Sequence, residues 1–160
     1  MDAGSLTAFV RYHASANRRI IQTAAELSDD ELRGPGPLDH GTAFQTLRHL
    51  VDVDWSWREF CTGNDVGPIY VWDQVALEDL ASIDRFSADE DARLLAYVRS
   101  LDDVTLAEPL ALSDEESVPR WLIVAHVVNH GTQHRSELAR FFTDRGHSPG
   151  ELDLLDAYAP

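Results

Sequence analysis

The feature that most constrains the fold is a run of three histidines, each four residues from the next. They are His126, His130 and His134. Residues four apart stack on one face of a helix, so two of these imidazoles can share one metal ion. Apolar residues recur at helical spacing on the face that carries His130, namely Ile123, Val127, Leu138 and Phe141. The stretch therefore predicts a core helix whose inner face carries polar groups, which are costly there unless they find partners.

The same stretch also has an ordinary interpretation. A buried histidine is more often a hydrogen-bonded core residue than a metal ligand. His134 and Glu137, which share the inner face, could form a simple ion pair. A metal ion would satisfy all of these groups, and the residues alone leave both interpretations open.

Composition narrows the functional classes. The chain has 160 residues and a net charge of −15, which argues against binding to nucleic acid or to anionic membrane surfaces. Its single cysteine, Cys61, has no partner for an internal disulfide and reads as a small buried residue. The first residues lack the basic start and apolar run of a signal peptide, and no apolar run reaches transmembrane length. We therefore expect a cytoplasmic protein.

Four segments carry apolar residues at helical spacing between turn-forming residues. They cover about residues 5–27, 42–61, 87–101 and 117–145. The second and third begin with the capping-box patterns Thr42-x-x-Gln45 and Ser87-x-x-Glu90. A short helix is expected within residues 71–80, and residues 105–116 should form an exposed connection or a small hairpin. The pattern predicts an all-α protein, a four-helix bundle in a single domain over residues 1–160.

His49 lies at the edge of the apolar face of the second predicted helix. Alone it would be a boundary residue. Bundles place metal sites between facing helices, so His49 opposite His130 and His134 would complete a site of three nitrogen ligands.

Four motifs in order along the chain resemble the DinB/YfiT-like superfamily. They are Tyr12-x-x-x-Ala16-Asn17-Arg18-Arg19, Leu47-x-His49-Leu50 with Trp57, His126 to Arg135, and Gly146-His147-Ser148-Pro149-Gly150. The resemblance covers nearly the whole chain, and the motif from His126 to Arg135 is its most specific part. One departure is Ser15, where relatives often carry an aromatic residue, so the wall that the first helix contributes to the pocket is expected to differ.

The resemblance implies a bundle of up-down-down-up type with a short irregular or hairpin insertion before the last helix. It implies a divalent metal on His49, His130 and His134. His126 is then left over, as a residue beside the metal or in the pocket. Glu137 is expected to orient a water or a ligating histidine, whereas Arg135 is either structural or meets a substrate carboxylate.

The resemblance also implies a reaction class. Characterised members use low-molecular-weight thiols such as mycothiol, bacillithiol or glutathione for S-transfer or thiol-assisted isomerisation of small electrophiles. Zinc and nickel are the ions we expect first, with iron, manganese and cobalt as alternatives. Relatives are often dimers, so a homodimer is the implied assembly. Two alternatives share the same metal site and stay open: a non-catalytic metal-binding stress-response protein and a metal-dependent hydrolase.

Imidazole binds metal only when neutral, so the sequence predicts that metal affinity falls as the pH drops through roughly 6, near the usual histidine pKa.

Overall fold

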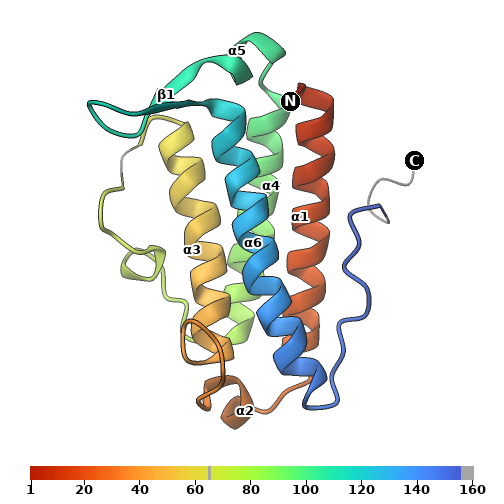
Figure 1. Cartoon of the computed structure of the whole chain (residues 1–160). Helices are drawn as coiled ribbons and strands as arrows, with labels where there is room; N and C mark the ends of the chain where they lie inside the picture. Colours follow the sequence, from red (N-terminus) through yellow and green to blue (C-terminus); the bar gives the residue numbers. More distant parts are fainter. Residues whose placement is uncertain (65, 156–160) are drawn as a thin grey trace.

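The computed structural model describes residues 1–64 and 66–155. Four long helices make up most of the fold (Figure 1). They are α1 (Ala3–Ala24), α3 (Ala43–Cys61), α4 (Leu80–Arg99) and α6 (Arg120–Thr143). Helices α1 and α3 each pack against both α4 and α6, so the four close into a ring. The colours of Figure 1 show that α1 and α6 run in one direction and α3 and α4 in the other. The predicted all-α bundle of up-down-down-up type is confirmed.

Polar caps explain where three of these helices begin. Asp2, Thr42 and Asp79 have extended backbones, and each side chain accepts a hydrogen bond from the amide three residues later. Such caps satisfy amides that have no partner within the helix. The start predicted near Thr42 is therefore correct to one residue.

The predicted start of the third long helix was wrong. The helix begins at Leu80, where Asp79 and Ser82 cap each other, and not at Ser87. Ser87 and Glu90 both lie in its buried interior, and Glu90 forms an ion pair with Arg58 of α3. A serine and a glutamate at capping-box spacing also occur inside helices. Here the carboxylate of Glu90 links α4 to α3 through its ion pair with Arg58.

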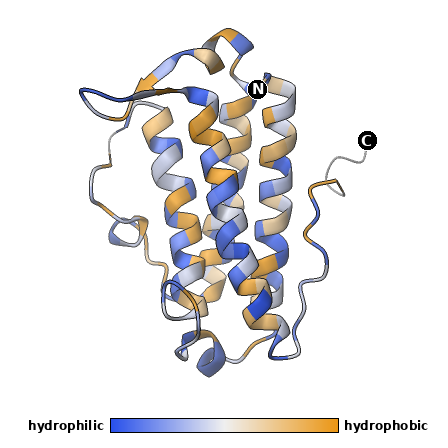
Figure 2. Ribbon diagram, in the orientation of Figure 1, coloured by the Kyte–Doolittle hydropathy of each residue, from blue (hydrophilic) through white to orange (hydrophobic). Residues whose placement is uncertain are grey.

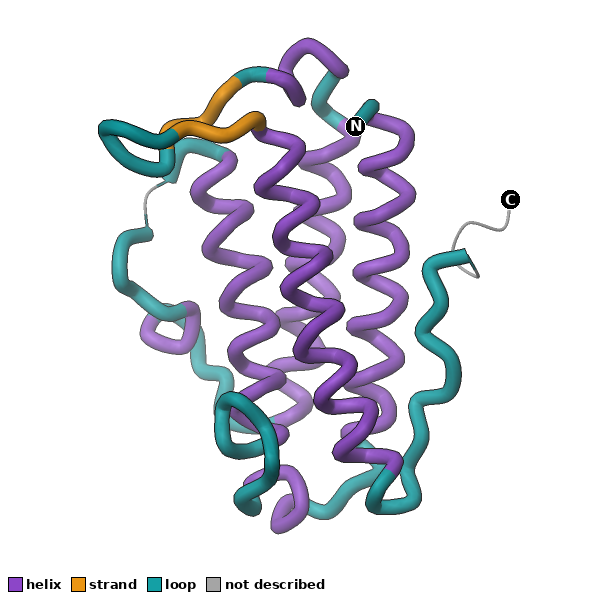
Figure 3. The backbone as a smooth tube through the Cα atoms, in the orientation of Figure 1, coloured by secondary structure: helices purple, strands orange, loops and turns teal. Residues whose placement is uncertain are grey.

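A small hairpin precedes the last helix. The sequence predicted either an exposed connection or a small hairpin here, and the hairpin is what the structure contains. The short helix α5 (Asp103–Ala107) comes first. Strand β1 (Pro109–Ala111) then pairs antiparallel with β2 (Ser117–Pro119). Figure 3 shows this hairpin across one end of the bundle. The last helix consequently begins at Arg120 and not at Ser117, because residues 117–119 belong to the hairpin.

The connection from α3 to α4 runs along the length of the bundle, since both helices point the same way (Figure 3). Its one regular element is the 3₁₀ turn Val71–Asp73, shorter than the helix expected within residues 71–80. Val71 is fully buried, and its amide donates to the buried carboxylate of Asp52 at 2.6 Å. This contact anchors the connection to α3.

The core combines apolar packing with a set of buried polar side chains. Figure 2 shows hydrophobic and hydrophilic residues interleaved along the long helices. The buried polar residues from the middle of the bundle are His13, Asn17, Asp54, Asp91 and Arg135. A chain this acidic thus buries part of its charge in its interior. Among the described residues, no helix is both long enough and apolar enough to cross a membrane.

Candidate metal centre

Three predicted ligands meet between α3 and α6. Nε2 of His49 lies 3.1 Å from Nε2 of His130. The ring centroid of His134 lies 4.9 Å from that of His49 and 4.6 Å from that of His130. The structure therefore brings together the helical pair His130 and His134 and the single histidine of α3, although the chain separates them widely.

The spacing of these nitrogens fits a shared metal ion. Bonds from zinc to imidazole are about 2.0–2.1 Å long, so two nitrogens on one ion lie roughly 2.9–3.4 Å apart, from a right angle to the tetrahedral angle. The 3.1 Å between His49 and His130 falls in that range. Neutral imidazoles from two helices are a donor set that divalent transition metals accept.

Burial keeps two of these imidazoles neutral. Loss of hydration, reinforced by the neighbouring histidines, lowers the pKa of His49 to about 4 and that of His130 to about 4. A group with such a pKa is uncharged at pH 7, so its lone pair is available to a metal. Nδ1 of His130 is moreover buried without a hydrogen-bond partner among the described residues, so the protein itself satisfies only part of this ring.

His134 is held by a carboxylate. The residue is 4% exposed, and its Nδ1 lies 3.3 Å from Oε2 of Glu137 one turn further along α6. A carboxylate on one ring nitrogen fixes the orientation of the imidazole and directs the other nitrogen towards the site. This contact fits both interpretations of the sequence, the simple ion pair and the orientation of a ligating histidine, so the role of Glu137 stays a prediction.

Sequence reasoning missed a fourth histidine, His40. It lies in the loop between α2 (Asp29–Arg33) and α3. Its ligand atom and those of His49 and His134 lie within 4.8 Å of one another. Loop residues have no periodicity, so the pattern that identified the helical histidines could not select it. One feature of the sequence could have indicated it. His40 stands two residues before the N-cap Thr42, and therefore next to the N-terminal end of α3, the helix that carries His49.

His126 lies beside the cluster rather than within it. Its ring centroid is 6.0 Å from that of His130 and 5.5 Å from that of Trp57, and the residue is exposed. Among the described residues, neither His126 nor His130 falls in a group of three ligand atoms that all lie within 4.8 Å of one another, so the two differ by the 3.1 Å contact of His130 with His49. His126 instead helps to line a cavity of about 240 Å³. The cavity is bounded by Trp57, Leu112, Val118, Leu122, Ile123 and His126. That His126 is not a ligand stays a prediction.

Arg135 points into the bundle, away from solvent. It is 1% exposed, and its Nη1 donates to Nδ1 of His13 at 3.0 Å and to Oδ1 of Asn17 at 2.7 Å. Nε2 of His13 in turn lies 2.9 Å from the carboxylate of Asp54. These contacts support the structural alternative for Arg135 rather than contact with a substrate carboxylate.

Asp91 completes this buried network and gives it a second group of converging ligand atoms, with His13 and Asp54. Burial raises the pKa of Asp91 to about 6. The guanidinium of Arg135 occupies the same interior and bonds to His13, so it already supplies the positive charge that a cation would bring. We therefore assign this group to the fold and keep the imidazoles between α3 and α6 as the candidate metal centre.

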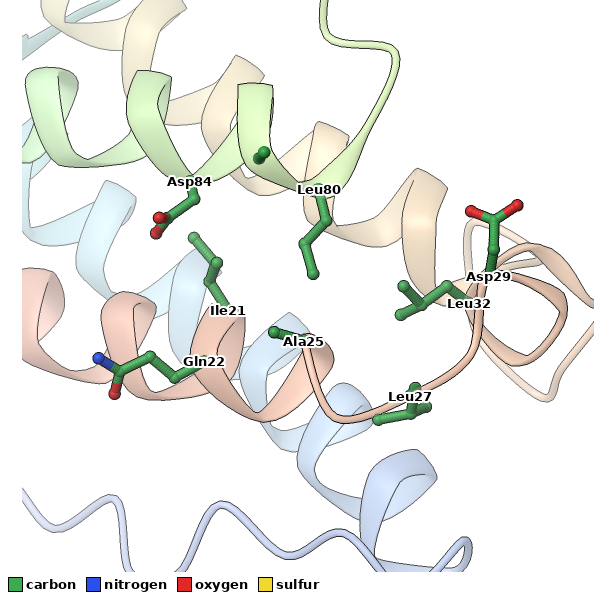
Figure 4. Close-up of a pocket in the computed structure, with 9 residues that line it drawn as sticks. Ile21, Gln22, Ala25, Leu27, Asp29, Leu32, Leu80 and Asp84 are labelled. Atoms are coloured by element: carbon green, nitrogen blue, oxygen red, sulfur yellow. The ribbon is translucent and has the colours of Figure 1, made fainter.

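A larger pocket lies on the opposite side of the bundle, between α1, α2 and α4 (Figure 4). Its volume is about 470 Å³. It is lined by Ile21, Gln22, Ala25, Leu27, Asp29, Leu32, Leu80, Ala81 and Asp84. There is no histidine or cysteine among these described residues, so size alone does not make it the reactive site.

Fold and site together define a class: helical bundles in which imidazoles from two facing helices converge on a candidate site for a divalent metal. Comparison with known families identifies it further. The model of the DinB family matches residues 2–159, nearly the whole chain, and the protein belongs to that family. No curated protein matches the chain with significant similarity.

Proposed function

We propose that the protein is a metal-dependent transferase that uses a low-molecular-weight thiol against small electrophiles, or isomerises them with the help of that thiol. The observation that carries the proposal is the convergence of His49, His130 and His134, two of them with strongly lowered pKa values. Zinc and nickel are the first candidates for the ion, and iron, manganese or cobalt are alternatives.

A divalent ion held by these imidazoles would supply a Lewis acid that lowers the pKa of a thiol or a water and yields a nucleophile at neutral pH. In the transfer itself, the thiol loses its proton, its sulfur forms a bond to the electrophilic carbon, and the leaving group departs with the electrons of its bond. The side chain of Glu137 is 22% exposed next to His134, so it is placed to accept that proton or to hold His134 in orientation.

The protein has no thiol of its own for this chemistry. Cys61 is its single cysteine. The residue is buried, and burial raises its pKa to about 11. A thiol with that pKa is protonated at neutral pH and unreactive. The nucleophilic sulfur must therefore come from a small molecule, which favours the thiol-dependent reaction over catalysis by a protein cysteine.

Access to the cluster supports an enzyme over a sealed structural metal. A metal sealed from solvent by Trp57, Phe60 and Tyr97 would indicate a structural site. The hydroxyl of Tyr97 instead donates to the carbonyl of Cys61 at 3.1 Å, and Trp57 packs against Phe60 at the wall of the 240 Å³ cavity. His49 and His130 keep partial exposure. This partial exposure leaves the two histidines within reach of a small electrophile, and the cavity lined by His126 lies next to His130.

The test begins with protein purified without a histidine tag or added metal, followed by measurement of its metal content. The metal-loaded protein is then given monochlorobimane with mycothiol, bacillithiol or glutathione in turn, and the fluorescent thioether is measured. We expect turnover with at least one thiol and none in His130→Ala. Bound metal without turnover by any thiol would support the non-catalytic alternative, whereas thiol-independent hydrolysis of an ester substrate would support the hydrolase.

A further inference from the structure

We propose that His40 is a fourth protein ligand of the metal centre, one that a substrate thiol displaces. The proposal rests on the metal site of the proposed function and adds to it a residue outside the three predicted ligands. Its starting point is the group formed by His40, His49 and His134, whose ligand atoms lie within 4.8 Å of one another.

The ring of His40 already lies over the site. Its centroid is 3.9 Å from that of His49, with the two rings stacked, and 5.1 Å from that of His134. These distances place it as close to the cluster as the helical histidines are to one another. Of the four, His40 is the most exposed, so it covers the cluster from the solvent side.

The loop that carries His40 is fixed at its base. The amide of Gly36 donates to the carbonyl of Gly41 at 2.8 Å, and the amide of Gly41 donates to that of Leu38 at 2.8 Å. Leu38 is buried, and a Cβ on Gly36 would lie 2.5 Å from the ring of Phe141 in α6. The backbone of the loop is thus held against the bundle near the C-terminal end of α6.

The side chain of His40 is free to move by comparison. No hydrogen bond to its ring is present within residues 1–64 and 66–155, whereas His134 is tied to Glu137. A ligand whose ring is held by stacking alone, without a hydrogen bond, is the one that an incoming ligand replaces at least cost. His40 would complete the nitrogen set in the resting protein, and a thiol would take its place.

Two opposite effects of removing His40 follow. Loss of residues that merely support ligands costs about 10–100-fold in metal affinity, so loss of a direct ligand in His40→Ala should weaken zinc binding by at least about tenfold. The same variant should bind a thiol more tightly, because nothing has to be displaced. Replacing a residue that only packs on the loop would not weaken zinc binding and strengthen thiol binding at the same time.

The experiment measures zinc affinity by competition with a chelator in the wild type, His40→Ala, His40→Gln and the control His147→Ala. His147 lies away from the cluster and pairs with Glu26. Cobalt-loaded protein then reports coordination through its visible absorption, before and during titration with glutathione. Circular dichroism checks that each variant is folded, and His40→Gln repeats the test with a side chain that keeps polarity and bulk.

We expect weaker zinc binding, an altered cobalt spectrum and tighter glutathione binding in both His40 variants, with His147→Ala unchanged. Wild-type affinity and spectrum in the His40 variants would overturn the proposal and leave the three-histidine site standing. Weaker zinc binding without tighter glutathione binding would make His40 a permanent ligand and overturn its displacement. A wild type that binds no zinc would instead remove the proposed function itself.

Discussion

Nε2 of His49 lies 3.1 Å from Nε2 of His130, although the two residues are 81 positions apart and belong to antiparallel helices. At that distance two neutral imidazoles must share a proton in a hydrogen bond or direct both lone pairs at a cation. The second arrangement is what a metal ion would stabilise, and it gives the first prediction.

Zinc should stabilise the wild-type fold, and His130→Ala should abolish this effect. At a metal concentration of 100 times Kd, binding contributes about 2.7 kcal/mol, which corresponds to a rise in Tm of about 5–10 °C for a domain of this size. The measurement is Tm of chelator-treated protein with and without zinc. His126→Ala is the matched control because it removes an imidazole one turn away on the same helix. Loss of the zinc effect in His126→Ala but not in His130→Ala would contradict the assignment.

The structure moves the predicted pH limit of metal binding downwards. Sequence alone put the loss of affinity near pH 6, because it assumed an ordinary histidine pKa. Burial holds the pKa of His49 and of His130 at about 4. At these two ligands protons should therefore compete strongly only as the pH falls towards that value. Zinc titrations at pH 7.5, 6.0 and 5.0 should show most of the affinity kept at pH 6.0, and its complete loss by that pH would contradict these pKa values.

The same two histidines should make the metal-free protein less stable in mild acid. Between the ordinary pKa of about 6.5 and the folded value of about 4, the unfolded chain binds protons that the folded chain does not. The free energy of unfolding therefore falls as the pH drops through this window. Asp91 acts in the opposite direction, since burial raises its pKa to about 6. Urea unfolding of wild type and His49→Ala isolates the histidine contribution, and the variant should show the smaller loss between pH 6.5 and 4.5.

The bundle could be predicted from the sequence because apolar residues recur along each long helix at helical spacing. The face shared by Ile123, Val127 and His130 repeats at the period of the helix, and that repeat fixes what the helix must bury. The contact of Arg135 with His13 has no such signal, because it joins residues 122 positions apart through their side chains. The sequence did not predict His40 as a site residue for a related reason, because it lies in a loop whose path depends on Gly36 packing against Phe141.

Gly131 should tolerate no side chain, even though it lies within a helix. A Cβ there would lie 2.5 Å from Nη1 of Arg135 and 2.7 Å from Cε1 of His13. Gly131→Ala gains about 1 kcal/mol of helix propensity, but overpacking of a buried network costs about 1–3 kcal/mol. We expect a lower free energy of unfolding by urea, whereas Asn129→Ala at an exposed position of the same helix should change it little. A stabilised Gly131→Ala would show that the network has room to move.

Arg135 should be among the most costly side chains to replace. It is 1% exposed, and its guanidinium donates to His13, Asn17 and Thr132. Its removal leaves the buried carboxylates of Asp54 and Asp91 without the charge of the guanidinium, and breaking a buried pairing of charges costs about 3–5 kcal/mol. Arg135→Met keeps an unbranched side chain and the helix propensity while removing the charge and the donors, so we expect a loss of that size in urea unfolding.

The matched control for Arg135→Met is Arg140→Ala on the same helix. Arg140 pairs with Asp144 through side chains that are 79% and 51% exposed, and such surface pairs contribute about 0–1 kcal/mol. The two arginines therefore differ in burial far more than in the number of opposite charges around them. If Arg135→Met destabilises no more than Arg140→Ala, the interior tolerates Asn17 and Nδ1 of His13 without their guanidinium partner, and these contacts do not hold α6 to α1. The larger loss in Arg135→Met is the result that the buried contacts require.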